Sequence, residues 1–155
     1  MAIDAYLQID SIKGESTDSA HAGWIECQSV HYSLKQPKSA TASTAGGHTA
    51  ERVELSEISL QKLCDVSSPI LAQHCAMGKT VPKAVFEFFR ADGDGNRVRY
   101  YVIELESVLI SHVAPTILPG VGMIEALGKY TQQRIAGGAG GNTAGSWNLA
   151  TNRVV

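Results

Sequence analysis

The strongest constraint on the fold of this chain is a pair of long β-type segments separated by a turn. Residues 83–90 contain the chain's three phenylalanines, and residues 98–113 form a long run rich in β-branched side chains. Residues 92–96, between them, are all Asp, Gly or Asn, which tolerate positive φ. The pattern predicts a long antiparallel β-hairpin.

Most of the remaining chain also has the alternation or composition of β-strands. Over residues 5–12, Ala5, Leu7 and Ile9 share one face of a predicted strand. Further strands are predicted over residues 24–34, 52–60 and 147–150. Residues 121–135 fit either a strand or a weak helix, and we favour a strand by analogy with the neighbouring segments. The glycine-rich residues 137–145 predict a flexible loop.

One segment has the pattern of an α-helix. Ser68 can cap a helix in which Pro69 takes the first position, and Gly78 can end it in the left-handed conformation. The apolar face between them is predicted to contain Ile70, Leu71, His74, Cys75 and Met77. Many strands and one helix together predict an all-β barrel or sandwich with one accessory helix.

Length and charge exclude several classes of protein. The 155 residues and formal charge of −2 predict one domain, residues 1–155, and no nucleic-acid partner, because Lys and Arg form no basic cluster. No run approaches the roughly 18 apolar residues of a membrane-spanning helix, so no membrane partner is expected. The N-terminus lacks the pattern of a signal peptide, which predicts synthesis in the cytoplasm without one.

Metal and cofactor sites are not predicted. Residues 92–96 resemble the start of an EF-hand, but Arg97 and Ile103 occupy the positions that such a loop requires to be Gly and Glu. Cys27 and His31 share a predicted strand face, yet four residues of strand separate them by about 13 Å, too far for one metal ion. The glycines near 120–122 and 137–141 lack the Lys-Ser/Thr of a phosphate-binding loop.

No set of residues predicts an enzyme. Ser29, Ser33, Cys27 and His31 are close in sequence, but the chain has no GxSxG elbow to position a nucleophile. Cys64 and Cys75 flank and occupy the predicted helix and are expected to be small buried apolar residues. The three cysteines, odd in number and widely spaced, are expected to remain reduced.

A series of short motifs runs along almost the whole chain in a characteristic order and spacing. They comprise residues 1–9, 13–16, Asp18, His21-Ala22, Ile25-Glu26, Asp65, Ser67-Ser68-Pro69, Gly78, Tyr101, Leu109-Ile110-Ser111, residues 145–149 and Asn152. In these motifs the chain resembles the haemolysin-coregulated protein (Hcp) family, the tube subunit of the type VI secretion system. It departs from the family at Lys13, where proline is usual, and over residues 121–135.

The resemblance implies a mainly β fold, a β-barrel of two antiparallel sheets with one flanking α-helix, that assembles as a hexameric ring. Such homohexameric rings stack into a tube inside a contractile sheath. The tube carries a spike protein and secreted effectors, and it is expelled to the extracellular space or into a target cell. The resemblance implies no catalysis and no cofactor.

Two groups of residues are candidates for contacts within such a tube. If the even-numbered face of residues 24–34 packs the barrel, then Ser29, His31 and Ser33 point into the lumen, where effectors bind. Residues 36–50 are small and polar and cannot form a core, and we predict that they order against the neighbouring ring. The residues of this ring-stacking loop are Ser39, Thr41, Ser43, Gly46 and Gly47.

A second hypothesis remains open. The residues themselves also fit a monomeric β-barrel that binds a small ligand without catalysis. The two hypotheses differ in oligomeric state, because a tube subunit forms six-membered particles and a ligand-binding barrel of this kind remains a single chain.

Overall fold

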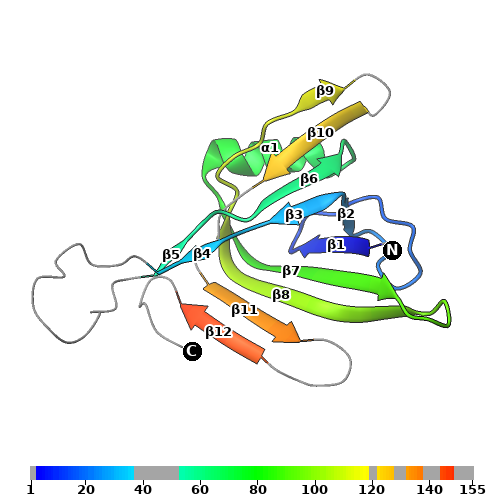
Figure 1. Cartoon of the computed structure of the whole chain (residues 1–155). Coiled ribbons are helices and arrows are strands. Elements are labelled where there is room, and N and C mark those ends of the chain that lie inside the picture. Colours follow the sequence, from blue (N-terminus) through cyan, green and yellow to red (C-terminus); the bar gives the residue numbers. More distant parts are fainter. Residues whose placement is uncertain (1–2, 37–52, 119–121, 128–131, 138–143, 149–155) are drawn as a thin grey trace, which may run out of the picture.

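The computed structural model describes residues 3–36, 53–118, 122–127, 132–137 and 144–148 (Figure 1). Within these residues the chain forms one α-helix and a series of β-strands. In chain order they are β1 (Ile3–Ile9), β2 (Ile25–Cys27), β3 (Ser29–His31), β4 (Leu34–Lys35), β5 (Glu54–Leu55), β6 (Ser59–Leu63), α1 (Ser68–Met77), β7 (Thr80–Ala91), β8 (Arg97–Leu109), β9 (Thr116–Leu118), β10 (Gly122–Leu127), β11 (Gln132–Gly137) and β12 (Ala144–Asn148).

The described strands form two main antiparallel sheets and a short ribbon. One sheet has six strands in the order β12-β11-β8-β7-β1-β2, and the other has four strands in the order β3-β6-β10-β9. The ribbon is the pair β4-β5, which extends away from the two sheets (Figure 1). The prediction of a mainly β fold with two antiparallel sheets and one helix is confirmed by these elements.

The predicted hairpin is the central pair of the six-stranded sheet. β7 and β8 pair from Thr80 opposite Leu109 to Ala91 opposite Arg97. In the turn, Asp92 Oδ1 accepts the N–H groups of Asp94 at 2.9 Å and Asn96 at 2.8 Å. Gly95 adopts a φ of 84°, which glycine reaches without steric cost. The Asp92 carboxylate thus closes the turn, as the sequence predicts.

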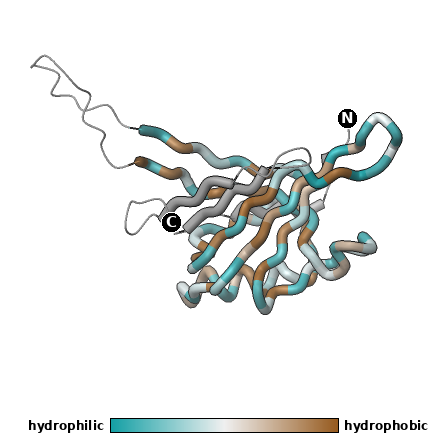
Figure 2. Tube along the Cα trace, turned by 90° about the horizontal axis from the view of Figure 1, so that it is seen from below, coloured by the Kyte–Doolittle hydropathy of each residue, from teal (hydrophilic) through white to brown (hydrophobic). Residues whose placement is uncertain are grey.

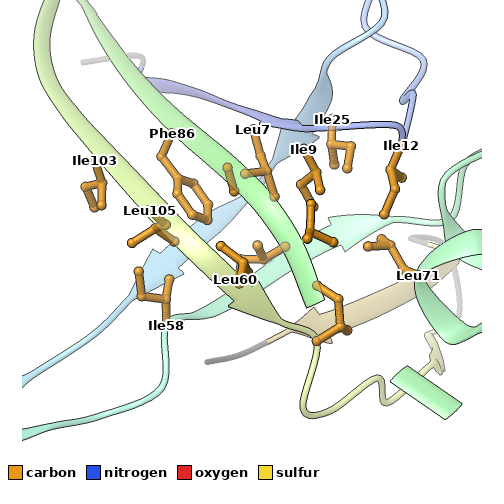
Figure 3. Close-up of a cluster of buried hydrophobic side chains, with 14 residues drawn as sticks. Leu7, Ile9, Ile12, Ile25, Ile58, Leu60, Leu71, Phe86, Ile103 and Leu105 are labelled. Atoms are coloured by element: carbon orange, nitrogen blue, oxygen red, sulfur yellow. The ribbon is translucent and has the colours of Figure 1, made fainter. Parts of the chain in front are cut away.

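The space between the two sheets is filled by apolar side chains. Hydrophobic and hydrophilic residues alternate along much of the trace (Figure 2), so each strand presents one apolar face. Side chains from both sheets and from α1 meet in one buried cluster (Figure 3). Its members are Leu7, Ile9, Ile12, Ile25, Ile58, Leu60, Leu71, Val81, Ala84, Phe86, Ile103, Leu105, Val108 and Ile110.

The helix begins and ends close to the predicted positions. Its N-cap is Ser67 rather than the predicted Ser68, and Gly78 ends it with a φ of 62°. Leu71 and His74 are buried, whereas Ile70 and Met77 are exposed. The apolar face that packs on the core is therefore narrower than predicted, because only one stripe of this short helix meets the sheets.

The prediction of one strand over residues 24–34 is wrong. The chain instead passes from the six-stranded sheet (β2) to the four-stranded sheet (β3) and then to the ribbon (β4). The transition lies at Gln28, whose N–H donates to the Gln61 carbonyl at 2.7 Å. Odd-numbered Ile25 is buried before this point, whereas even-numbered Val30 packs against the core after it.

Two further segments differ from prediction in a similar way. Residues 53–60 contain parts of two strands, β5 in the ribbon and β6 in the four-stranded sheet, and Ile58 between them is buried. Residues 121–135 are β-structure, as favoured, but β10 and β11 belong to different sheets. The closing strand β12 begins at Ala144, earlier than predicted and within the residues predicted to form a glycine-rich loop.

Candidate functional site

The three residues predicted to line a lumen are exposed. Ser29 and His31 belong to β3, and Ser33 follows it. Val30 and Tyr32, which alternate with them, are half-buried and pack against the core. Val30 and Tyr32 thus meet the condition on which the lumen prediction depends, and the placement of Ser29, His31 and Ser33 in a lumen stays a prediction.

The predicted ring-stacking loop lies outside the described residues. Ser39, Thr41, Ser43, Gly46 and Gly47 fall within residues 37–52, between β4 and β5. The pairs Leu34–Leu55 and Lys35–Glu54 bring the two ends of this segment together. The prediction for the loop itself stays a prediction.

The most elaborate polar site is one that the sequence analysis did not single out. It lies in the connection between β1 and β2, where residues 13–24 fold back on themselves. Gly14 N–H donates to the Gly23 carbonyl at 2.7 Å, and Ser16 N–H donates to the Trp24 carbonyl at 3.0 Å. The His21 N–H donates to the Asp18 carbonyl at 3.1 Å. This local folding directs the side chain of His21 onto the six-stranded sheet.

His21 lies between two carboxylates. Its Nδ1 is 2.7 Å from Oδ2 of Asp18, and its Nε2 is 2.8 Å from Oε2 of Glu87 in β7. Each carboxylate also pairs with an arginine of β8. Arg97 Nη1 contacts the second oxygen of Asp18, and Arg99 Nη1 lies 2.8 Å from the second oxygen of Glu87. The histidine is 4% exposed, so the network is centred on a buried ring.

Aromatic rings enclose the same histidine. The Tyr6 ring stacks on the His21 ring with centroids 4.5 Å apart and planes 6° from parallel. Trp24 and Phe89 meet it edge-on at 4.7 and 4.8 Å. Arg97 lies over both Tyr6 and Phe89, and its Nη2 bonds the Tyr6 hydroxyl at 2.8 Å. The site combines ionic contacts with an apolar enclosure.

The network shifts the pKa values of Asp18 and Tyr6. The hydrogen bond from His21, followed by that from Arg97, lowers the pKa of Asp18 to about 2. Burial raises the pKa of Tyr6, against the opposing effect of Arg97. Asp18 and Glu87 accept hydrogen bonds from charged donors, and the site contains no serine or cysteine that the histidine contacts. Its chemistry is therefore that of an ion-pair network that holds structure.

The sequence carried only part of the signal for this site. Asp18 and His21 stand among the motif residues, three positions apart, but Glu87 is 66 positions from His21 and Arg97 is 79 from Asp18. Such partners meet only through the pairing of β1 with β7 and of β7 with β8.

A second ionic group lies at the start of α1. Lys62 in β6 is fully buried, and its Nζ donates to Asp65 Oδ1 at 2.8 Å, Ser68 Oγ at 2.9 Å and the Leu63 carbonyl at 3.0 Å. Asp65 Oδ1 also accepts the Ser67 N–H at 2.9 Å. A charged group this deep is tolerated because its hydrogen-bonding capacity is used.

The cysteines differ from expectation in one case. Cys75 is half-buried, but Cys64 is exposed, because β6 ends at Leu63 and Cys64 lies outside the core. Burial raises the pKa of the Cys27 thiol to about 12. Cys27 and Cys64 line an open pocket of about 330 Å³ together with Glu15, Glu26 and Asp65.

Searches of the described residues found neither a metal-binding cluster nor a membrane-spanning helix. No group of three or more His, Cys, Asp or Glu side chains among them is arranged to hold a metal ion. The one helix in this part of the chain is too short to cross a bilayer.

Comparison with known proteins gives consistent results. The family described as "Type VI secretion system effector, Hcp" matches residues 6–135. Protein hcp1 of Pseudomonas aeruginosa is 32% identical over 114 residues, which are 74% of this chain and 68% of that protein.

Solved structures share the fold. Hcp1 from Salmonella typhimurium superposes with a TM-score of 0.82 at 22% identity, covering 100% of both chains. The secreted protein Hcp3 from Pseudomonas aeruginosa gives a TM-score of 0.74 at 16% identity, covering 95% of this chain and 98% of its own. Because the family match extends from β1 to β11 and includes α1, the chain belongs to the Hcp family of type VI secretion proteins.

Proposed function

We propose that this protein is a subunit of the inner tube of a type VI secretion system. In this proposal six copies form a ring, rings stack within the sheath, and the tube leaves the cell with the spike protein and carries effectors in its lumen. The observation that carries the proposal is family membership across residues 6–135, which include most of both sheets.

The family also bears on catalysis. Hcp proteins are non-catalytic structural components of the type VI system, which confirms the prediction that the chain is not an enzyme. The two ionic groups of the structure agree with this, since both join one structural element to another: His21 joins the β1–β2 connection to β7, and Lys62 joins β6 to α1.

The surface supports self-association. Four large apolar side chains, Leu34, Leu63, Val66 and Met77, are about half exposed, from 46% to 57%. The main sheets also have edge strands, β2 and β12 in one and β3 and β9 in the other. Exposed apolar residues and strands at the edge of a sheet favour contacts with other chains, and a closed ring can cover both.

The interior favours the tube over the alternative of a ligand-binding barrel. The space between the two sheets is occupied by the buried cluster of Figure 3, to which Phe86, Leu105 and Leu60 contribute from different strands. A barrel that holds a small ligand needs an internal cavity in that position.

Light scattering coupled to size-exclusion chromatography tests the proposal directly. We expect six chains per particle, and a particle of one chain would support the monomeric ligand-binding alternative. In bacteria, we expect the protein in the medium or in target cells only when the sheath is intact. Release that persists without the sheath would contradict the assignment to the tube.

The exposed row of Ser29, His31 and Ser33 is our candidate for the lumen wall. Repeated around a ring, His31 would form a belt of imidazoles whose charge responds to pH. Effector retention should then change between pH 5 and 8 in the native protein and not in His31→Ala. His112→Ala, which removes another exposed histidine, is the matched control. Equal retention by His31→Ala and native protein at each pH would refute the role.

The candidate stacking loop is tested by deletion. Removing residues 39–47 takes away Ser39, Thr41, Ser43, Gly46 and Gly47. Rings of six should persist while stacked tubes disappear in electron micrographs. A Gly/Ser segment of equal length in the same place controls for the change in loop length. Normal tubes from the deleted chain would show that stacking uses other residues.

A further inference from the structure

The buried histidine of the β1–β2 connection has a defined charge state. Nδ1 and Nε2 of His21 both lie within hydrogen-bond distance of carboxylate oxygens, at 2.7 and 2.8 Å. An ionised carboxylate only accepts hydrogen bonds, and a neutral imidazole has a single N–H. Only the imidazolium, with an N–H on both nitrogens, satisfies both contacts.

The carboxylates are held in their ionised form by other donors. Asp18 contacts Arg97, and its Oδ2 accepts the Ala20 N–H at 3.2 Å. Glu87 pairs with Arg99 at 2.8 Å. The low pKa of Asp18 agrees with this arrangement. The proton between His21 and each carboxylate therefore belongs to the ring.

Every element packed against the ring contributes to the local charge balance. The loop contributes Asp18, β7 contributes Glu87, β8 contributes Arg97 and Arg99, and β1 contributes Tyr6 and Asp4. Asp4 lies 3.3 Å from Arg97. With His21 charged, three cationic groups face three carboxylates, and loss of its proton leaves one unbalanced buried negative charge and an acceptor facing an acceptor.

The ring connects two parts of the fold. Tyr6, Glu87 and Phe89 form its platform on the face of the six-stranded sheet opposite the core, since Leu7 and Phe86 point into the core. Residues 13–24 bond mainly to themselves, through Gly14, Ser16 and Gly23. The contacts of His21 and Asp18 with β7 and β8 are thus the ionic attachment of this segment to that face.

We propose that His21 is a pH-sensitive latch, whose imidazolium fastens residues 13–24 to the outer face of the six-stranded sheet and whose deprotonation releases them. The latch belongs to the single subunit and does not depend on the proposed role in the tube. The imidazolium holds residues 13–24 in place at mildly acidic pH, and their attachment to the sheet weakens at alkaline pH.

The direction follows from linkage. Only the charged ring satisfies both carboxylates, so the contacts of His21 are complete while the ring is protonated and are weakened when it loses a proton at higher pH. Asp18 acts in the opposite direction. Its contribution is present above its ordinary value and is lost as the pH falls towards 2. Residues 13–24 are therefore held on the sheet while Asp18 is ionised and His21 is protonated.

Nitrogen-15 NMR of the five histidines tests the charge state. We expect both ring nitrogens of His21 to show the chemical shifts of an imidazolium at pH 6, as its two carboxylate contacts require. A neutral tautomer of His21 at pH 6, or titration together with the exposed histidines, would overturn the proposal.

Amide hydrogen exchange tests the release. The N–H groups of Gly14, Ser16 and Gly23 should lose protection by about tenfold or more between pH 6 and pH 9, after correction for the intrinsic rate, while that of Ile103 in the core should not. Equal corrected protection at both pH values would refute the latch.

Substitution separates the latch from simple packing. In His21→Gln the stability loss relative to native protein should be larger at pH 6 than at pH 9, and exposed His112→Gln should show no such difference. A loss that is constant with pH would mean that His21 only packs. Glu87→Gln keeps the imidazole of His21 and replaces the test if His21→Gln does not fold. In this variant His21 should lose its proton at a lower pH than in native protein, and an unchanged pH dependence would contradict the proposal.

Discussion

Nζ of Lys62 lies 2.8 Å from Oδ1 of Asp65, and this buried ion pair fixes the start of α1 to the end of β6. Asp65 Oδ1 also accepts hydrogen bonds from the N–H and the hydroxyl of Ser67, which is the N-cap of the helix. One oxygen of Asp65 therefore both pairs with Lys62 and orders the first turn of α1. The side chain of Ser67 does not itself cap the helix.

The two partners of this pair should respond unequally to substitution. Asp65→Ala removes a carboxylate that lies 2.8 Å from a fully buried ammonium and should cost about 1.5–3 kcal/mol in the free energy of unfolding. Lys62→Met removes the charge, keeps an unbranched apolar stem and should cost less. Urea denaturation measures both, and equal losses would show that the ion pair does not determine the stability here.

Gly14 should tolerate no side chain. A Cβ at this position would lie 2.4 Å from the Trp24 carbonyl oxygen and 2.7 Å from the Ile25 Cα, both of which belong to the backbone. We expect Gly14→Ala to lower stability by about 1–3 kcal/mol, because β2 must shift to admit the methyl group. Gly93→Ala is the control, since a Cβ there meets nothing within 4 Å. Similar melting temperatures for the two variants would contradict this reading.

Two tyrosines join the connection after β3 to the six-stranded sheet. The hydroxyl oxygens of Tyr32 and Tyr101 are 2.5 Å apart, and burial, followed by the bond to Tyr32, raises the pKa of Tyr101. Either single Tyr→Phe substitution leaves one half-buried hydroxyl without this partner, at about 0.5–1.5 kcal/mol. The double substitution should cost less than the sum of the two. A double-mutant cycle measures the difference, and strict additivity would show that the hydroxyls do not interact.

Sequence alone predicted the elements whose signals are local. The turn at residues 92–96 contains the Asp, Gly and Asn that close it, and α1 is bounded by Pro69 and Gly78, whose backbone preferences act without partners. Both are present in the structure. The strand patterns predicted a barrel or a sandwich without its sheet order, and the resemblance to the Hcp family added two antiparallel sheets with one flanking helix.

Sequence patterns did not predict where a strand passes from one sheet to the other, or which side chains far apart in the sequence contact each other. At Gln28 the strand leaves one sheet for the other, and its alternation reverses from Ile25 to Val30 without any glycine or proline to mark the place. A lysine in a strand is usually exposed, and the burial of Lys62 depends on its hydrogen bonds to Asp65 and Ser68. The His21 site needs Glu87, which only the β1–β7 register brings near.

The cysteines should differ in reactivity in an order that burial sets. Cys64 is exposed, so we expect a maleimide or a disulfide reagent to modify it in the folded protein. Burial raises the pKa of Cys27 to about 12, so at pH 8 almost none of it is thiolate, and in the folded protein it should react much more slowly than Cys64, although both line the same open pocket. Mass spectrometry after brief labelling, with and without urea, distinguishes the sites, and Cys64→Ser serves as the control. Rapid labelling of Cys27 in that variant without denaturant would contradict the predicted order of reactivity, because it would show that the raised pKa does not protect this thiol.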